Sequence, residues 1–210
     1  MRTLGKVAVL AGVVAAQAGE KTRFEPRPAT EYAHRQTVEK VTIAVEPFED
    51  REEMKQAFGK TDPGKWGVLP VLLVLANDTD RALHLANMRV QLITASGQKA
   101  DSIPGDEVEK PRPTGRHSPF PVPSPIPGGI PRPGKGQSKS MEIAAREFVA
   151  PMAAPRGTVH GFFFFRVGKA AERLADSRLY ITGIRDARTG QELFYFEIAL
   201  GGDSGKRGRN

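Results

Sequence analysis

The sequence predicts a mainly β protein, an antiparallel sandwich of six to eight short strands with two or three short helices. Apolar residues alternate with polar ones at period two in several short segments. Turn signals rich in Gly, Asn and Asp separate these segments. A chain of 210 residues, 39% hydrophobic and without Cys, suits one core plus flanking segments. This composition excludes a coiled coil, a collagen-like repeat, a disulfide scaffold and a polytopic membrane protein.

Residues 1–18 have the order of a secretory signal peptide. Arg2 and Lys6 form a basic start, residues 7–16 are apolar or Gly, and 16–18 read Ala-Gln-Ala, a small-x-small cleavage site. The apolar run is about half as long as a membrane-spanning helix needs. We therefore predict an exported protein, periplasmic or extracellular, whose mature chain begins near Gly19 and holds no transmembrane segment. A buried first strand is the alternative interpretation.

The mature chain divides into a linker, a folded body with one insertion, and a tail. Residues 19–36 are polar and predict a linker. A sandwich is expected over 37–200, interrupted at 110–139 by an insertion that holds nine of the 17 prolines. Proline donates no ladder hydrogen bond, so the insertion is expected to be polyproline-II or disordered. It is interpreted as a spacer or, alternatively, as a docking segment for a partner. Residues 201–210 predict a basic flexible tail.

The positive charge lies mostly outside the expected body. The formal net charge is +7 and the pI about 9.8. The segment 110–139 carries six basic residues and no acidic one, and the tail carries three against one. The rest of the mature chain is net acidic, which disfavours nucleic acid as a partner.

Six segments predict strands, with turn chemistry between them. Residues 41–46 alternate and predict a half-buried strand, whereas 68–76 are continuously apolar and end at a turn that starts at Asn77. A strand over 88–92 leads to a two-residue hairpin loop at Ser96 and Gly97. The remaining predicted strands are 158–167, 179–184 and 192–200.

Helix signals are few. Asp50 with Glu53 forms a variant of the capping box. Met54, Ala57 and Phe58 share one face of the helix that would follow, which is expected to end at Gly59. A second short helix is predicted over 141–148, ahead of Pro151, and a single helical turn over 170–175.

Segments 68–80, 88–98, 157–167 and 192–198 resemble the strands of secreted bacterial immunoglobulin-like domains. With Phe58 and Gly59 ahead of the first of them, the chain is similar to uncharacterised exported proteins and envelope lipoproteins with such a domain. The resemblance implies an immunoglobulin-like sandwich and no catalytic residues. The chain differs from the lipoproteins because it has no lipid-accepting Cys. Asp176 and Tyr180 have the spacing of a tyrosine corner, although Thr182 stands where Cys would follow.

Four consecutive phenylalanines, 162–165, form the most unusual segment. In a strand, Phe163 and Phe165 face one side, and Phe162 and Phe164 face the other. One pair is expected in the core, and the second is covered by the chain's own 141–148 segment or by a partner. The candidate partner surface comprises Phe162, Phe164, Phe120, Arg116 and Arg132.

No residue pattern identifies an enzyme. His34, His84, His117 and His160 stand singly, and no nucleophile elbow or phosphate loop is present. Asp78 and Asp80 fit an Asx-rich turn better than a Ca²⁺ site. The acidic run of 49–53 suits the start of a capped helix better than a glycosidase pair. We therefore expect no catalytic residue, no cofactor and no metal.

Three function classes remain, and the first is preferred. The first is a non-enzymatic module that binds another envelope or secreted protein, or has a structural role there. The second is an exported hydrolase built from Glu49, Asp50 or Asp62 with His84 or His160. The third is a weak binder of polyanions or cell-wall polymers through the insertion and the tail.

Overall fold

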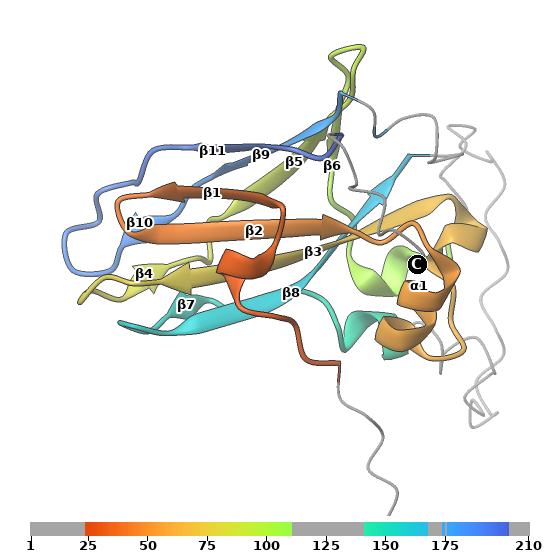
Figure 1. Cartoon of the computed structure of the whole chain (residues 1–210), viewed down its shortest axis with the longest axis horizontal. Coiled ribbons are helices and arrows are strands. Elements are labelled where there is room, and N and C mark those ends of the chain that lie inside the picture. Colours follow the sequence, from red (N-terminus) through yellow and green to blue (C-terminus); the bar gives the residue numbers. More distant parts are fainter. Residues whose placement is uncertain (1–23, 111–140, 168–173, 175, 202–210) are drawn as a thin grey trace, which may run out of the picture.

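The computed structural model describes residues 24–110, 141–167, 174 and 176–201, and shows a mainly β chain with three antiparallel sheets (Figure 1). The predicted signal peptide and tail lie outside the described residues. So do the insertion, apart from Lys110, and most of the predicted helical turn at 170–175.

The first sheet has the strand order β1-β2-β3-β8. Its strands are β1 (His34–Val38), β2 (Val41–Pro47), β3 (Val68–Asn77) and β8 (Thr158–Arg166). Glu39 and Lys40 connect β1 to β2 with φ angles of 49° and 65°, a tight hairpin turn that matches the twist of the strands. The long apolar strand β3 lies inside the sheet, paired with β2 on one side and β8 on the other.

The second sheet has the order β11-β9-β5-β6, and a small third sheet has the order β10-β4-β7. The second sheet comprises β5 (Arg89–Ile93), β6 (Lys99–Asp101), β9 (Arg178–Thr182) and β11 (Phe196–Ala199). The third comprises β4 (Leu83–His84), β7 (Met152–Ala153) and β10 (Arg185–Asp186). Because β8 pairs with β3 and β9 with β5, strands far apart in the chain become neighbours.

One hydrophobic core lies between the first and second sheets. Alternate residues of facing strands fill it, such as Ile43 and Leu73 from the first sheet and Leu179 from the second. The prediction of two β layers sharing one core is confirmed to this extent.

A second core lies on the other face of the first sheet. It is covered by α1 (Arg51–Phe58), by the 3-10 turns η1 (Ala29–Glu31) and η3 (Gly105–Glu107), and by the helical residues 141–144. Residues 41–45 of β2 are therefore all buried. The prediction of a half-buried strand here is wrong, because the small Thr42 and Ala44 face this second core.

The aromatic run of β8 divides between the two cores. Phe165 enters the first, whereas Phe162 and Phe164 enter the second and are 1% and 0% exposed. The Phe162 ring lies 4.7 Å from the Phe58 ring and 5.0 Å from the Phe48 ring, centroid to centroid. The expectation that Phe162 and Phe164 belong to a partner surface is wrong, since this chain covers both. Phe120, Arg116 and Arg132 lie outside the described residues.

The segment ahead of β1 belongs to the body. Tyr32 is 2% exposed, and the Phe24 ring lies 5.9 Å from that of Phe48. The prediction of a polar linker over 19–36 is therefore wrong for residues 24–36. These apolar anchors follow no strand or helix period, so the sequence pattern does not reveal them.

Local signals predicted several element ends. Asp50 accepts hydrogen bonds from the backbone N–H groups of Glu52 and Glu53, and Gly59 ends α1 with φ 64°. The 3-10 turn η2 (Pro63–Trp66) follows, capped by Asp62. The predicted hairpin at 96–97 exists, but its loop is one residue longer, because Gly97 N–H donates to Thr94 O and Thr94 N–H to Gln98 O. The second helix ends at residue 144, earlier than predicted, since the chain then runs alongside β8.

Among the described residues, no helix has both the length and the apolar character needed to cross a bilayer.

Candidate functional site: the outer sheet face and its cleft

The outward face of the β11-β9-β5-β6 sheet presents side chains to solvent. Leu179 and Ile181 of β9 enter the first core, so Arg178, Tyr180 and Thr182 point outward. The outward residues of β9, β11 and β6 are all exposed or partly exposed. The first sheet, by contrast, contributes buried residues to a core on each of its faces.

Cross-strand contacts order this outer face. The Tyr180 and Tyr195 rings lie 5.2 Å apart, centroid to centroid. Arg178 pairs with Glu197 across β9 and β11 at 2.7 Å. Gln91 Nε2 donates to Asp101 Oδ1, also at 2.7 Å, between β5 and β6. These pairs fix side chains that would otherwise lose rotamer freedom when a partner binds.

Two aromatic side chains project from the chain just before β11. Phe194 is 73% exposed and Tyr195 is 50% exposed. They are the only large aromatic side chains among the exposed large hydrophobics of the described chain. A pair of exposed rings beside an ordered sheet face is typical of an interaction surface.

A cleft of about 560 Å³ opens beside this face. It is lined by Ala86, Asn87, Met88, Arg89, Thr182, Gly183, Arg185 and Glu192. Arg89 and Thr182 are cross-strand partners at the ends of β5 and β9 and point outward from the sheet. The cleft and the outer face are therefore continuous.

The cleft wall depends on a close backbone approach at Gly183. This residue has φ 80°, and a Cβ built on it would lie 2.1 Å from Asn87 O, so only Gly fits. Its N–H donates to Glu192 Oε1 at 2.9 Å, while Arg185 Nη2 donates to Glu192 Oε2 at 3.0 Å. Among the described residues that line the cleft, Glu192 has the only carboxylate, and both of its oxygens are thus occupied.

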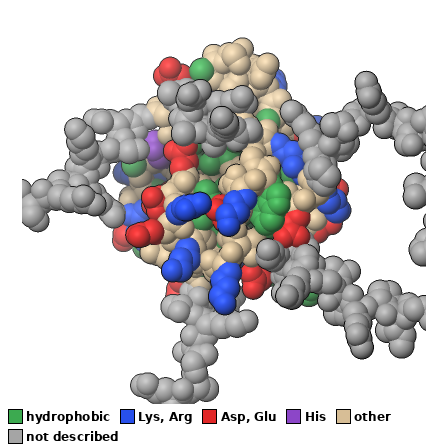
Figure 2. Space-filling view, turned by 90° about the vertical axis from the view of Figure 1, so that its right-hand side faces the viewer, with side chains coloured by type: hydrophobic (Ala, Val, Ile, Leu, Met, Phe, Trp, Pro, Cys, Tyr) green, Lys and Arg blue, Asp and Glu red, His purple; other side chains and the backbone are tan. Residues whose placement is uncertain are grey.

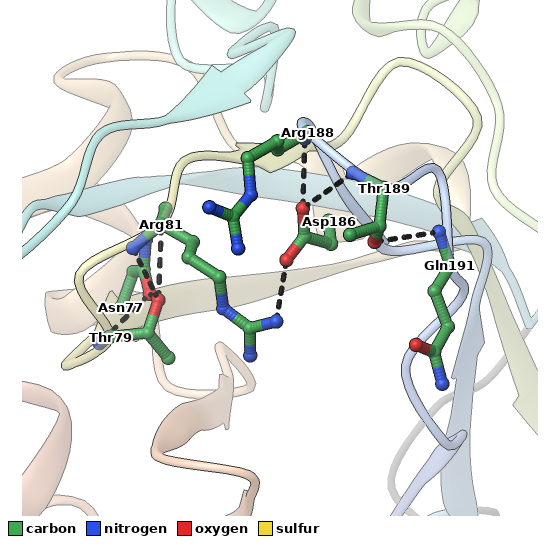
Figure 3. A network of polar contacts seen from close by, with 7 residues as sticks. All are labelled: Asn77, Thr79, Arg81, Asp186, Arg188, Thr189 and Gln191. Atoms are coloured by element: carbon green, nitrogen blue, oxygen red, sulfur yellow. Dashed lines mark hydrogen bonds and ion pairs between the residues drawn. The ribbon is translucent and has the colours of Figure 1, made fainter.

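The turn between β3 and β4 is held by a buried amide (Figure 3). Asn77 is 0% exposed, and its Nδ2 donates to Arg81 O and Ala154 O at 2.7 and 2.9 Å. Its Oδ1 accepts from the N–H and hydroxyl of Thr79. The predicted Asx-rich turn is present, and Asn77 is the residue that organises it.

Asp186 holds the loop that carries the cleft and aromatic residues (Figure 3). Its Oδ1 accepts from the N–H groups of Arg188 and Thr189 at 2.8 and 2.9 Å, and its Oδ2 lies 2.7 Å from Arg81 Nη1 in an ion pair. The Thr189 N–H, assisted by Arg188 and by the Arg81 charge, holds the pKa of Asp186 below its ordinary value, although burial opposes this. The turn after β3 and the loop after β10 are therefore locked together.

A second cleft, of about 360 Å³, lies between the β1–β2 and β3–β4 turns and includes Asp78, Asp80 and Arg81. The Arg156 guanidinium donates twice to Asp80 Oδ1, at 3.0 and 2.7 Å, and holds the pKa of Asp80 low. Asp80 is thus engaged by Arg156. In the described part of the chain, no group of three or more His, Asp or Glu side chains is placed to hold a metal ion.

The residues of the hydrolase hypothesis do not converge on His84. Asp50 caps α1 and Asp62 caps η2, after the end of β2 where Pro47 pairs with Val71. His84 follows the other end of β3, and ten strand residues span about 33 Å. Burial raises the pKa of Glu49, which lies next to Asp50. His160 pairs with Val74 midway along β3, His34 lies on β1, and His117 is outside the described residues.

The α1 end of the molecule offers no surface of one charge sign in the view of Figure 2, where Lys and Arg side chains lie interspersed with Asp and Glu. Lys110, the one described residue of the basic insertion, pairs with Asp106 at 3.2 Å. The rest of the insertion and the tail, on which the polyanion hypothesis depends, lie outside the described residues.

Sequence reasoning did not single out Arg89, Arg185, Glu192, Phe194 or Tyr195. One signal was available, because two adjacent aromatic residues in a predicted strand cannot both face its core. The cleft itself depends on contacts between separate turns, which no local pattern contains.

No family model matches the chain, and no curated protein matches it.

Proposed function

We propose that this chain is an exported, non-enzymatic β-sandwich of the immunoglobulin-like kind that binds another envelope or secreted protein. Its binding surface is the outer face of the β11-β9-β5-β6 sheet together with the adjoining cleft. The observation that carries the proposal is the exposure of Phe194 and Tyr195 in the segment between Glu192 of the cleft and β11, where the Tyr195 ring contacts Tyr180 on the outer sheet face.

The topology supports the immunoglobulin-like part of the proposal. Two antiparallel four-stranded sheets share a core, and successive strands pass from one sheet to the other. Thus β8 joins the first sheet beside β3, and β9 then joins the second beside β5. Such crossings are a feature of Greek-key sandwiches.

The composition of the face supports a protein partner. Aromatic residues and Arg are enriched at the centres of protein interfaces, and Tyr and Arg are among the residue types enriched at the few positions that dominate the binding energy. Phe194 offers no hydrogen-bonding group, so covering its ring yields only hydrophobic and dispersion energy, about 1.5–3 kcal/mol for full burial. A protein surface with an apolar patch would supply that cover.

The proposal of export rests on residues 1–18, with their basic start, apolar run and Ala-Gln-Ala end. The proposal of a non-enzymatic role rests on the separation of Asp50 and Asp62 from His84, which lie beyond opposite ends of β3.

The test is partner capture in the native cell with face and control variants. A photo-crosslinking residue at Thr182 is combined with Phe194→Ala and Tyr195→Ala, or with Met141→Ala and Val149→Ala as controls. Met141 and Val149 are 71% and 77% exposed. Met141 starts the helical residues 141–144 over the second core, and Val149 follows Phe148, whose N–H donates to Phe162 O of β8. We expect one protein adduct that persists in the controls and falls at least about tenfold in the face variants.

Equal loss in both sets, or an adduct insensitive to Phe194 and Tyr195, would contradict the proposal. A hydrolase assay of the mature protein distinguishes a binding module from an enzyme. Turnover that is abolished by His84→Asn or Asp50→Asn would replace binding by catalysis.

A further inference from the structure

The cleft beside the outer sheet face has a surplus of hydrogen-bond donors. Arg89 makes no hydrogen bond or ion pair with any described residue, so its five guanidinium N–H donors are open to solvent. Arg185 uses one Nη2 donor on Glu192, which leaves its other donors available. Glu192 is the only acidic residue in the part of the cleft lining that the structure describes, and Gly183 and Arg185 occupy its carboxylate oxygens.

The geometry points to a carboxylate-binding site in this cleft, and we propose that it receives an Asp, Glu or C-terminal carboxylate from an acidic segment of a protein partner. This inference rests on the proposed function and deepens it by assigning the partner's chemistry. A guanidinium fork matches the two oxygens of a carboxylate in one plane, whereas an ammonium does not.

Arg89 and Arg185 lie on separate segments that the fold holds rigidly together. Arg89 starts β5 and pairs across the ladder with Thr182, the residue before Gly183. Arg185 starts β10, pairs with His84 on β4, and is oriented by Glu192. The ladder fixes the backbone of Arg89, and Glu192 also orients the Arg185 guanidinium, so a carboxylate that binds here has mainly the Arg89 side chain to order.

The neighbouring rings favour a peptide over an acidic sugar polymer. Phe194 is 73% exposed and wholly apolar, and Tyr195 packs on Tyr180 along the sheet. An extended peptide presents a carboxylate and an apolar side chain within a few residues of each other. A cleft of about 560 Å³ accommodates a side chain or a chain end but not a folded domain.

The test uses fluorescence polarisation of the full mature protein with labelled probes at low salt. The probes are a dodecapeptide of alternating Glu and Gly that contains one Leu, the same peptide with Gln for Glu, and an oligogalacturonate. We expect the Glu peptide to bind with a dissociation constant below about 1 mM and at least about tenfold more tightly than the Gln peptide. Absence of Glu-peptide binding would overturn the inference.

Three substitutions give the site its signature. Arg89→Gln should weaken binding of the Glu peptide at least about tenfold. Arg89→Lys should weaken it less, because Lys keeps the positive charge but loses the forked guanidinium geometry. Glu192→Gln should tighten binding about threefold, since a competing negative charge is removed while an acceptor for Gly183 remains. Arg51→Gln, the same charge change at the exposed start of α1, is the control.

Equal weakening by Arg51→Gln would show that only net charge matters and would overturn the site. Tighter binding of oligogalacturonate than of the peptide, with the same dependence on Arg89, would replace the protein partner by a polysaccharide. If the peptide fails to bind while the cellular adduct still depends on Phe194 and Tyr195, the carboxylate site fails and the proposed function stands.

Discussion

Phe162 and Phe194 show how far residue identity determines burial. The first is 1% exposed and the second 73% exposed, although both are Phe in or next to a strand. The alternation of 162–165 predicts that the pairs diverge, but the rings that cover Phe162 come from Phe48 and Phe58, more than a hundred positions away. The direction in which a side chain points follows from the local sequence, whereas the residues that bury it lie far away in the chain.

Truncation of these two rings should therefore have very different effects. Phe162→Ala removes a ring from the second core and is expected to lower the free energy of unfolding by about 3–5 kcal/mol. Phe194→Ala, the matched control, should change it by less than about 0.5 kcal/mol. Urea denaturation of both variants measures this, and a small effect of Phe162→Ala would mean that the second core is loosely packed.

Asp186 should make stability dependent on acid pH. Its hydrogen bonds from Thr189 and Arg188 and its ion pair with Arg81 hold its folded-state pKa below the ordinary 3.8. A depressed carboxyl pKa adds stability above pH 3.8 that is lost as the pH falls through the folded value. Asp186→Asn keeps an acceptor oxygen but cannot be charged.

We expect Asp186→Asn to lower the melting temperature at pH 7 and to make the loss of stability below about pH 4 shallower than in the wild type. Thermal melts from pH 7 to pH 2 provide the measurement. Parallel pH curves for the two proteins would show that the ion pair contributes nothing. Asp101→Asn, at an exposed hydrogen-bonded pair between β5 and β6, is the control substitution.

At the scale of helices and strands, local residues determine where an element begins and ends, but they do not determine which other elements pack on it. Asp50, Gly59 and Gly97 mark a helix start, a helix end and a hairpin as predicted, because each satisfies or permits a specific backbone geometry. The half-buried prediction for 41–46 is wrong, because burial of a strand depends on what packs on each face. Period-two patterns report polarity, and the small Ala44 and Thr42 face a core that nothing in their own segment reveals.

The cap of α1 offers a test of local energetics. Asp50→Ala removes the acceptor for the Glu52 N–H at 2.6 Å and should lower the unfolding free energy by about 1 kcal/mol. Gln56→Ala, an exposed mid-helix change, should stay within about 0.5 kcal/mol of the wild type. Denaturant titration measures the unfolding free energy of both variants. Equal values would mean that the Asp50 cap does not stabilise α1.

For the whole molecule, contacts on both sides of the insertion support its removal. Gly105 N–H donates to Glu147 Oε2 at 2.9 Å, so η3 and the chain after the second helix are joined directly. Arg166 of β8 donates to the carbonyls of Glu107 and Lys110 at 2.6 and 2.7 Å. Replacing 111–140 by a short Gly-Ser linker should thus retain a cooperative melt within a few degrees of the wild type.

Circular dichroism of that deletion variant provides the measurement. A non-cooperative melt, or a large fall in melting temperature, would mean that the insertion contributes to the cores. The same deletion removes most of the basic residues on which the polyanion hypothesis depends. Unchanged polymer binding by the deletion variant would therefore contradict that hypothesis.

The predicted export has a direct test at the start of the chain. If 1–18 is a signal peptide, N-terminal sequencing of the protein purified from the native cell should begin near Gly19. Such a chain keeps Phe24 and Tyr32, which pack on the second core, and should be as stable as the unprocessed chain. Retention of residues 1–18 in the native protein would remove the argument for export.

The sequence predicted the body of the fold better than the candidate site. Its strands, its first core and α1 follow from residue periods and caps within single segments. The cleft depends on Gly183 meeting Asn87, on Glu192 reaching back to Arg185, and on Asp186 joining Arg81. Each contact links separate turns, so it exists only once the two sheets have assembled.

The position of β3 has a consequence for how the molecule loses its structure. Leu72 and Leu73 are neighbours in the chain, yet one packs in each core, so both hydrophobic interiors share a single strand as their common wall. Neither core can unfold alone, because loss of β3 from one core also removes it from the other. The backbone amides of β3 should then exchange with deuterium only in global unfolding. The exchange rate should be the same for residues whose side chains face the first core and for those whose side chains face the second.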